Sequence, residues 1–362
     1  MPVLLALLLL VLPLRAQALA QLELRDVSGA YARWIAENPP DPEGHPEPGY
    51  HFLAEVHAAM APWVARRPEV VRPFIAGRSV QGRPLWGYVL HDPGHPVKAR
   101  VLVFANLHAI EWVGTEGALA LALEQAAQPM PGVELVVIPV VNVDGRLLVE
   151  EDLREGVNRF RRTNAHGVDL NRDFAVNHEA ESFWRHLFPG FHASSLAPLS
   201  QPESQAIDRV ASLGHFDLAV SLHAWGGLVY LPWSGRWDRP PDWPSLHALG
   251  VAMNAGQGAH AYRWEQLARW GFFFRAQGSE IDHLYGTYGI PAALVECTKT
   301  GLSPFRPGEW GNFFRRYNPR DPSRHVREGL RLLRAGMMHV AQSVSARPTA
   351  TPAVLDLPGH GE

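Results

Sequence analysis

The chain has 362 residues, of which 46% are hydrophobic and 19% are charged, and its formal net charge is -3. This balance is typical of a globular protein and excludes a disordered chain, and the scattered basic residues argue against a nucleic-acid partner. The single cysteine, Cys297, excludes an internal disulfide and a cysteine zinc knuckle, so the 18 histidines form the pool of possible metal ligands.

The N-terminus reads MPVLLALLLLVLPLRAQALA, an apolar run followed by small residues at Ala16, Ala18 and Ala20. Signal peptidase prefers small residues at its cleavage site, and the run is shorter than the ~20 residues that span a membrane. We therefore expect residues 1–20 to be a cleaved signal peptide rather than a stable membrane anchor. The protein is expected to be periplasmic or secreted.

Proline and glycine mark the two ends of the folded body. The stretch PPDPEGHPEPG at 39–49 excludes regular structure, and the tail from Ser345 is again rich in proline. We expect a Pro/Gly-rich arm over 21–49, a single folded domain over 50–344 and a flexible tail over 345–362.

Inside this body, continuous apolar runs alternate with helical segments. Strands are predicted at 84–90, 99–106, 133–142, 217–225 and 292–298, and helices at 115–128, 201–213 and 323–344. Runs that are apolar without alternation are typical of strands that helices bury on both faces. The sequence therefore predicts an α/β fold in which ligands bind at strand ends.

Polar side chains stand where these runs end, at 106–108, at 142–144, at His223 and at Glu296. The first end carries a His-x-x-Glu pair, His108 and Glu111. The same pattern at 178–181 and 325–328 is interpreted as a solvated helix face or a capping acid. Because only His108 and Glu111 follow a buried strand and precede a helix, they are candidates for two metal ligands.

A catalytic zinc ion takes three protein ligands from histidine and carboxylate side chains and leaves a fourth position for water. His223, in VSLHAWGG, ends another apolar run and is the candidate third ligand. Judged alone, it could equally be a core histidine packed against Trp225. The three residues together favour zinc.

Two further stretches bring charge into this region. RRTNAHGVDLNRDF (161–174) has Asn171 beside Arg172, and a guanidinium with an adjacent amide can bind a carboxylate, although a surface arginine in a loop is the alternative. Glu296 ends the apolar run in PAALVECTKTG, where burial of a charged side chain costs free energy. A role as general base would explain a glutamate at this position, and a buried salt bridge is the alternative explanation.

Taken in order, these stretches resemble the zinc carboxypeptidase family, the funnelin-type metallocarboxypeptidases related to the pancreatic carboxypeptidases. The motifs, from about Tyr50 to His339, are AGRSVQGRPLWGYVL, NLHAIEW, VIPVVNVDG, GVDLNRDF, LSQPESQAI, SLHAWGGLVYLPW and GSEIDHLYGTYGIPAALVE. The resemblance implies one catalytic α/β domain, whose central mixed, mostly parallel sheet is covered by helices on both faces.

The resemblance also implies a metal centre with one Zn²⁺ per chain. His108, Glu111 and His223 would be its ligands, and Asp169 would orient a ligand histidine.

The remaining implied roles concern the substrate. Glu296 would be the general base, and Arg162 would stabilise the oxyanion, with Arg159 and Arg161 as close alternatives in sequence. Asn171 and Arg172 would clamp the terminal carboxylate of a peptide.

Four positions bear on substrate binding and preference. The family usually has arginine where this chain has Ile110, and a mobile tyrosine that covers the bound C-terminal residue where it has Phe274. Ile281 stands where the family samples the substrate side chain, which favours an apolar C-terminal residue, whereas the adjacent Glu280 could attract a basic one.

The sequence thus predicts a zinc-dependent metallocarboxypeptidase that hydrolyses the C-terminal bond of peptides with a free carboxylate, through a metal-activated water. Two alternatives stay open: a peptidase of the same fold that trims D-amino-acid peptidoglycan stems, and a zinc- or peptide-binding homologue without catalysis.

Overall fold

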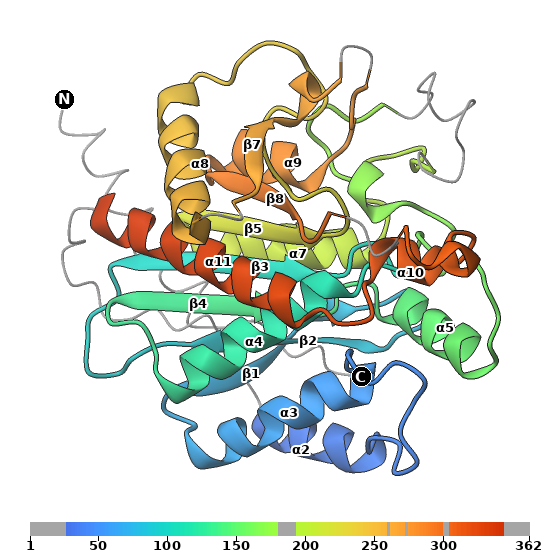
Figure 1. Ribbon diagram of the computed structural model, residues 1–362. Coiled ribbons are helices and arrows are strands. Elements are labelled where there is room, and N and C mark those ends of the chain that lie inside the picture. The colour runs from blue at the N-terminus through green and yellow to red at the C-terminus, as the bar shows by residue number, and fades with distance from the viewer. Residues whose placement is uncertain (1–26, 180–192, 259–260, 272–273, 300–303, 344–362) are drawn as a thin grey trace.

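An eight-stranded sheet forms the centre of the computed structural model, which describes residues 27–179, 193–258, 261–271, 274–299 and 304–343 (Figure 1). The strands are β1 (Val71–Arg78), β2 (Pro84–Leu90), β3 (Ala99–Ala105), β4 (Val133–Ile138), β5 (Leu218–His223), β6 (Leu228–Leu231), β7 (Arg263–Gln266) and β8 (Ala292–Glu296). Their order across the sheet is β1-β2-β4-β3-β5-β8-β6-β7.

Strands β4, β3, β5 and β8 run parallel to one another, and β6 is parallel to β7. The pairs β1–β2, β2–β4 and β6–β8 are antiparallel. The predicted α/β fold with a mixed, mostly parallel sheet is confirmed.

The helices are α2 (Val27–Glu37), α3 (Leu53–Arg66), α4 (Val113–Ala127), α5 (Val143–Arg154), α7 (Pro202–Gly214), α8 (Trp243–Gln257), α9 (Glu280–Tyr288), α10 (Phe313–Tyr317) and α11 (Ser323–Ser343). Figure 1 shows α4, α8 and α11 in front of the sheet and α7 behind it, while α2 and α3 lie beside the β1 edge. Short 3-10 turns occur at Leu170–Arg172, Leu267–Arg269 and Pro307–Glu309.

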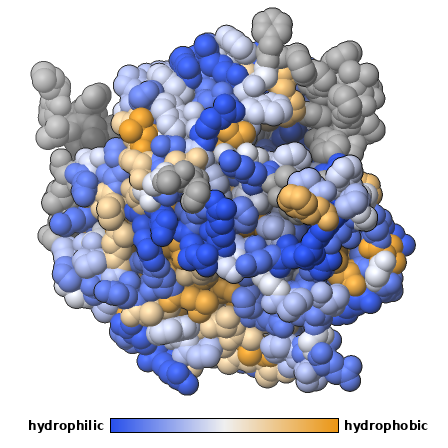
Figure 2. All heavy atoms as spheres, viewed as in Figure 1, coloured by the Kyte–Doolittle hydropathy of each residue, from blue (hydrophilic) through white to orange (hydrophobic). Residues whose placement is uncertain are grey.

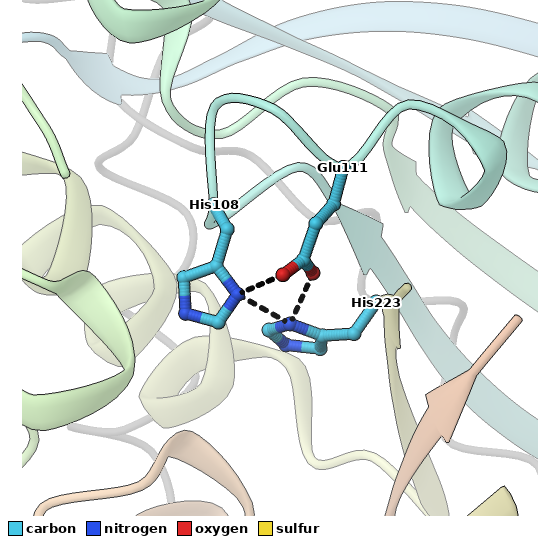
Figure 3. Close-up of side chains that lie close together, drawn as sticks. All are labelled: His108, Glu111 and His223. Atoms are coloured by element: carbon cyan, nitrogen blue, oxygen red, sulfur yellow. Dashed lines mark hydrogen bonds and ion pairs between the residues drawn. The ribbon is translucent and has the colours of Figure 1, made fainter. Parts of the chain in front are cut away.

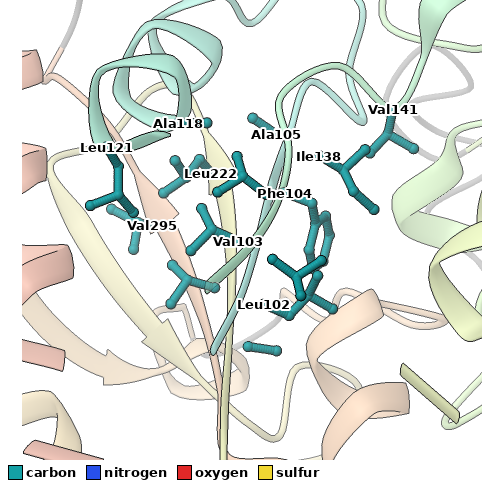
Figure 4. Packing of buried hydrophobic residues seen from close by; sticks show 14 of the residues in the cluster. Leu102, Val103, Phe104, Ala105, Ala118, Leu121, Ile138, Val141, Leu222 and Val295 are labelled. Atoms are coloured by element: carbon teal, nitrogen blue, oxygen red, sulfur yellow. The ribbon is translucent and has the colours of Figure 1, made fainter. Parts of the chain in front are cut away.

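Strands β4 and β5 are buried along their whole length, as their largely apolar sequences predict. Figure 4 shows Val103, Leu222 and Val295 packed together in this core, with Ala118 and Leu121 of α4 nearby. Helix α4 approaches β5 closely at Gly114, where an added Cβ would lie 2.7 Å from the Leu222 carbonyl oxygen. Because a backbone atom cannot move aside cheaply, glycine is required there for this approach.

Two sequence expectations change in the structure. The run predicted as a strand over 133–142 ends at Ile138, and Asn142 instead caps α5 by accepting a hydrogen bond from the Gly145 N–H. The expected irregular arm contains α2, whose Tyr31 is buried and donates to the His57 carbonyl oxygen. Val27, Tyr31 and Trp34 are spaced to share one helix face, so the folded body includes residues before the expected start at Tyr50.

The predicted signal peptide (1–20) and the predicted tail (345–362) lie outside the described residues. None of the helices in the described part of the chain is long and apolar enough to cross a membrane. Figure 2 shows one face of the molecule, which is mostly hydrophilic with scattered hydrophobic patches.

Candidate metal centre

His108 and Glu111 lie in the short loop between β3 and α4. Asn106 opens this loop with a φ of 59°, a left-handed conformation that asparagine tolerates better than most residues. Its side-chain amide donates to the carbonyl oxygens of His108 and Glu111, at 2.8 and 3.1 Å. The buried asparagine therefore holds the two candidate ligands in a fixed turn.

His223 joins this pair from the end of β5, which lies next to β3 in the sheet. Its Nδ1 lies 3.0 Å from His108 Nδ1 and 3.1 Å from Glu111 Oε2, and His108 Nδ1 lies 2.9 Å from Glu111 Oε1. Figure 3 shows the three side chains pointing toward one another. Among the residues that the structure describes, these three form a cluster whose ligand atoms lie close enough together to hold a metal ion.

The outer nitrogens of both histidines are engaged by carboxylates. His108 Nε2 lies 3.0 Å from Asp169 Oδ1, and His223 Nε2 lies 3.0 Å from Glu280 Oε1. A hydrogen bond at Nε2 leaves Nδ1 as the metal-binding nitrogen and fixes the ring orientation. Two histidine nitrogens and a carboxylate that converge in this way fit a zinc site with an open fourth position.

Glu280, which the sequence offered only as a possible contact for a basic substrate residue, lies beside the metal cluster. It is fully buried in the first turn of α9 and faces His223, so it is not placed to attract a basic substrate side chain. Burial acts to raise its pKa, but hydrogen bonding to His223 holds the pKa below the usual glutamate value. The signal available in the sequence was an acid inside the stretch GSEID, next to an apolar helix face.

Arg162 lies beside the same cluster. Its Nε donates to Asp169 Oδ2 at 2.8 Å, and its Nη1 lies 3.4 Å from Glu111 Oε1. The neighbouring candidates Arg159 and Arg161 instead form ion pairs with Asp152. Of the three arginines in this stretch, Arg162 is the one that lines the cavity described next.

A cavity of about 670 Å³ opens beside the three ligands. Its lining includes His108, Glu111, Arg162, Asn171, Arg172, Ala224, Trp225, Gly226, Leu228, Tyr230, Arg263, Leu267, Trp270, Phe274, Ala276, Leu294, Glu296 and Tyr317. Residues that are far apart in the sequence thus share one cavity.

Asn171 and Arg172 belong to a 3-10 turn that Asp169 caps by accepting a hydrogen bond from the Asn171 N–H. Both side chains are buried, and Asn171 Oδ1 makes no hydrogen bond within the described residues. A buried polar atom without a partner costs about 1–3 kcal/mol, so it commonly marks a place where a ligand binds.

Glu296 ends β8 and is paired in register with His223 on β5. Its Oε2 is buried and has no hydrogen-bond partner in the described part of the chain. Burial, followed by the charge of Glu111, raises the pKa of Glu296 to about 8. Gly226 makes room for this side chain, because an added Cβ would lie 3.1 Å from the Glu296 Cβ.

The two residues predicted to contact the substrate side chain differ in position. Phe274 lines the cavity, whereas Ile281 is fully buried in α9 and is not among the lining residues. Ile281 is on the buried face of its helix, and its contact with a substrate side chain stays a prediction.

The other His-x-x-Glu patterns do not form comparable clusters in the described residues. His325 and Glu328 lie on α11, with 3.9 Å between His325 Nδ1 and Glu328 Oε2. His178 is half-buried near Ser195, and its partner in the pattern, Glu181, lies outside the described residues.

Comparison with known proteins places these residues in a wider context. A family model described as zinc carboxypeptidase matches residues 56–309. The chain is 25% identical over 268 residues to carboxypeptidase A6 of Mus musculus, covering 70% of this chain and 61% of that protein. It is 25% identical over 284 residues to carboxypeptidase A1 of Rattus norvegicus, covering 71% and 64%. The chain thus spans under two thirds of the length of these relatives.

Solved structures share the fold. The carboxypeptidase A from Helicoverpa armigera has a TM-score of 0.67 at 21% identity, covering 90% of this chain and 81% of that one. Bovine thrombin-activatable fibrinolysis inhibitor, in complex with tick carboxypeptidase inhibitor, has a TM-score of 0.66 at 20% identity, covering 82% and 98%.

Proposed function

The chain belongs to the zinc carboxypeptidase family, and on this premise we propose that it is a zinc-dependent hydrolase that removes the C-terminal residue from peptides. One observation carries the proposal. His108 and Glu111 line a single cavity with the unpartnered Glu296 Oε2 and an Asn/Arg pair, and His223 converges on the same two ligands.

His108, Glu111 and His223 would hold the zinc ion through Nδ1, a carboxylate oxygen and Nδ1. When bound, zinc supplies Lewis-acid chemistry suited to peptide hydrolysis. Asp169 and Glu280 hold the two imidazole rings in the required orientation.

Glu296 would act as the general base. Its buried, unpartnered Oε2 can accept a proton from the attacking water and later pass that proton to the leaving amine. Burial raises the pKa of Glu296, which makes its carboxylate a stronger base toward water than an exposed glutamate would be.

Arg162 would stabilise the negative charge that develops on the carbonyl oxygen. Asp169 fixes its guanidinium beside Glu111, so the donor is already oriented before the substrate binds.

Arg172 and Asn171 would bind the free carboxylate of the substrate. A guanidinium forms paired, charge-assisted hydrogen bonds with a carboxylate, and the Asn171 side chain adds another polar contact. Because this pair sits in the same cavity as Glu296, it restricts cleavage to the last peptide bond.

The cavity lining supports a preference for an apolar C-terminal side chain. Leu228, Leu267 and Leu294 contribute apolar surface. Arg263, also in the lining, would repel a terminal lysine or arginine.

A peptide library tests the proposal. The library varies the C-terminal residue, includes L- and D-residues, and presents each peptide with a free or an amidated C-terminus. We expect release of one L-residue from free peptides only, loss of activity with a chelator and recovery with zinc. Equal cleavage of amidated peptides would refute the carboxypeptidase assignment, and cleavage restricted to D-residues would favour the peptidoglycan alternative.

We also propose that the protein is exported. The apolar N-terminal run and the small residues at Ala16, Ala18 and Ala20 support cleavage after residue 20. Fractionation of a secreting host and N-terminal sequencing test this: protein retained in the cytoplasm would contradict export, and an intact Met1 in the exported fraction would contradict cleavage.

A further inference from the structure

A tyrosine that no sequence motif singled out lines the candidate active site. Tyr317 is the last residue of α10, and its side chain is only 6% exposed. It lines the same cavity as His108, Glu111 and Glu296. Its ring packs against Phe160, with the ring centroids 6.1 Å apart.

The next residue, Asn318, fastens this end of α10 to the metal-ligand loop. Its Oδ1 accepts from the Trp112 N–H at 2.9 Å, and its Nδ2 donates to the Ile110 carbonyl oxygen at 2.7 Å. Ile110 and Trp112 flank Glu111 on either side in the chain. One fully buried amide therefore ties the backbone beside Tyr317 to the backbone around a candidate zinc ligand.

The N-terminal segment holds α10 from another side. Arg315 forms an ion pair with Glu47, and the Tyr50 hydroxyl donates to the Pro319 carbonyl oxygen at 2.6 Å. Phe314 packs edge-on against Trp112, with centroids 5.0 Å apart. These contacts fix the position of Tyr317 before any substrate is bound.

The Tyr317 hydroxyl is unpaired among the residues that the structure describes. It makes no hydrogen bond within the described residues, although several other buried tyrosines, such as Tyr31 and Tyr50, do. The charged groups that act on it are chiefly Glu111, Arg162 and Glu296. Burial and then Glu111 raise its pKa, so the hydroxyl keeps its proton at neutral pH.

The position of Tyr317 identifies the part of the substrate that its side chain borders. Tyr317 shares the cavity with Glu111, the candidate zinc ligand, Arg162, the candidate oxyanion donor, and Glu296, the candidate base. Asn318 ties the backbone beside Tyr317 to the residues on either side of Glu111. We therefore associate Tyr317 with the metal-ligand side of the cavity, where the scissile carbonyl would bind.

Resting on the proposed function, we propose that Tyr317 is a catalytic residue, whose hydroxyl donates a hydrogen bond to the scissile carbonyl oxygen as it becomes negative, alongside Arg162. Such a donor, aimed at charge that develops only in the transition state, raises kcat more than it improves substrate binding. Asn318 is the corresponding positioning residue.

The test compares Tyr317→Phe with the parent zinc enzyme on a peptide with a free C-terminus. We expect kcat to fall on the order of 100-fold, with KM nearly unchanged. Affinity for a phosphonate peptide, whose tetrahedral oxygens replace the scissile carbonyl, is expected to fall by a similar factor. Binding of the shortened peptide product, measured by calorimetry, is expected to stay the same.

Tyr285→Phe is the matched control. It removes a hydroxyl that bonds Asp242 at 2.9 Å, from a side chain that is 7% exposed and is not in the cavity lining. Its kinetics should equal those of the parent. Because the Tyr317 hydroxyl makes no hydrogen bond in the described part of the chain, Tyr317→Phe should also keep the parent melting temperature.

The outcomes separate the two proposals. A parent enzyme that cleaves no peptide overturns the proposed function and this inference together. A parent that is active with a Tyr317→Phe variant of equal kcat overturns only the role of Tyr317. A rise in KM alone, or a large drop in melting temperature, would assign the hydroxyl to ground-state binding or to stability and would likewise refute the proposal.

Discussion

At the scale of single residues, some polar atoms of the site already have hydrogen-bond partners within the described residues, and others do not. The two histidines use Nε2 for carboxylate partners and turn Nδ1 inward, while Glu296 Oε2 and Asn171 Oδ1 have no partner in the described part of the chain. Unpaired buried oxygens are costly, at about 1–3 kcal/mol each. A substrate or a water that pairs with them recovers this free energy, which is a physical reason for binding at this place.

Glu296→Gln is expected to reduce kcat by roughly 1000-fold, because the amide keeps the shape of the side chain but cannot accept a proton from water. Zinc content, measured by atomic absorption, should stay at the parent value, since Glu296 is not in the ligand cluster. Glu309→Gln, which changes an acid paired with Arg320 outside the cavity, serves as the control. Parent-level turnover in Glu296→Gln would eliminate the general-base mechanism.

Arg172→Ala should chiefly raise KM for peptides with a free carboxylate. A hydrogen bond to a charged group contributes about 1.5–3 kcal/mol, which corresponds to roughly 10- to 100-fold in KM. Arg161→Ala is the matched control, because Arg161 pairs with Asp152 and does not line the cavity. If both variants bind substrate like the parent, the carboxylate clamp has to be assigned to other residues.

At the scale of elements, the site depends on three neighbouring parallel strands. β3, β5 and β8 lie side by side, so the loop after β3, His223 at the end of β5 and Glu296 at the end of β8 meet at one edge of the sheet. The close approach of α4 to β5 at Gly114 brings the Glu111 loop onto this edge. Helices α2 and α3 stabilise the far side of the sheet through a buried polar chain.

That chain predicts acid sensitivity. His57 on α3 is buried, its Nδ1 lies 2.7 Å from the Tyr88 hydroxyl, and its ring packs edge-on against Trp34 of α2. Burial, with a smaller effect from Arg146, lowers the pKa of His57 to about 3. The folded state therefore keeps the ring neutral, whereas the unfolded chain binds a proton near its ordinary pKa of ~6.5.

The stability that this difference contributes is complete above pH 6.5 and is lost as the pH falls from there toward 3, by up to ~1.4 kcal/mol per pH unit. Urea unfolding at pH 7.5 and pH 5 should show a clear loss for the parent and a smaller loss for His57→Gln. His95→Gln, at an exposed turn, should follow the parent. An identical pH dependence in all three proteins would show that His57 titrates normally in the folded state.

At the scale of the whole molecule, distant parts of the chain complete one site. Glu47 and Tyr50 near the start of the body hold α10 near its end, and Asn318 then ties α10 to the loop of His108 and Glu111. Zinc would add a further link between β3 and β5, because its candidate ligands come from both.

Metal removal should therefore lower the melting temperature. A ligand that binds only the folded state stabilises it by about 2.7 kcal/mol at 100 times its dissociation constant, which corresponds to a shift of roughly 5 °C or more. Scanning calorimetry with and without a chelator measures this shift, and added zinc should reverse it. His108→Ala should remove the response, while His325→Ala, in the unrelated pattern on α11, should keep it. A chelator without effect on the parent would argue against a bound metal.

Five of the eight strands and the main candidate groups could be predicted from the sequence, because each depends on local information, whereas β1, β6 and β7 were not predicted. Unbroken apolar runs predict buried strands, and polar residues at the ends of these runs predict the sheet edge where ligands would bind. His108, His223 and Glu296 are such residues. The local pattern also revealed the His-x-x-Glu pair. It occurs three times, and only the predicted strand before His108 distinguished that copy as the candidate metal site. We did not predict helix α2, because the proline-rich stretch that follows it led us to expect an arm over this region.

Only the tertiary structure could decide which side chains face one another. Ile281 and Glu280 are adjacent in the sequence, yet one packs into the core and the other bonds His223, because successive residues on a helix point in different directions. Tyr317 reaches the site through contacts with segments more than 200 residues away, at Ile110 and Glu47, and no local pattern encodes such contacts. The sequence by itself determined which chemistry the chain carries, and the packing of the sheet and α10 determined where that chemistry is assembled.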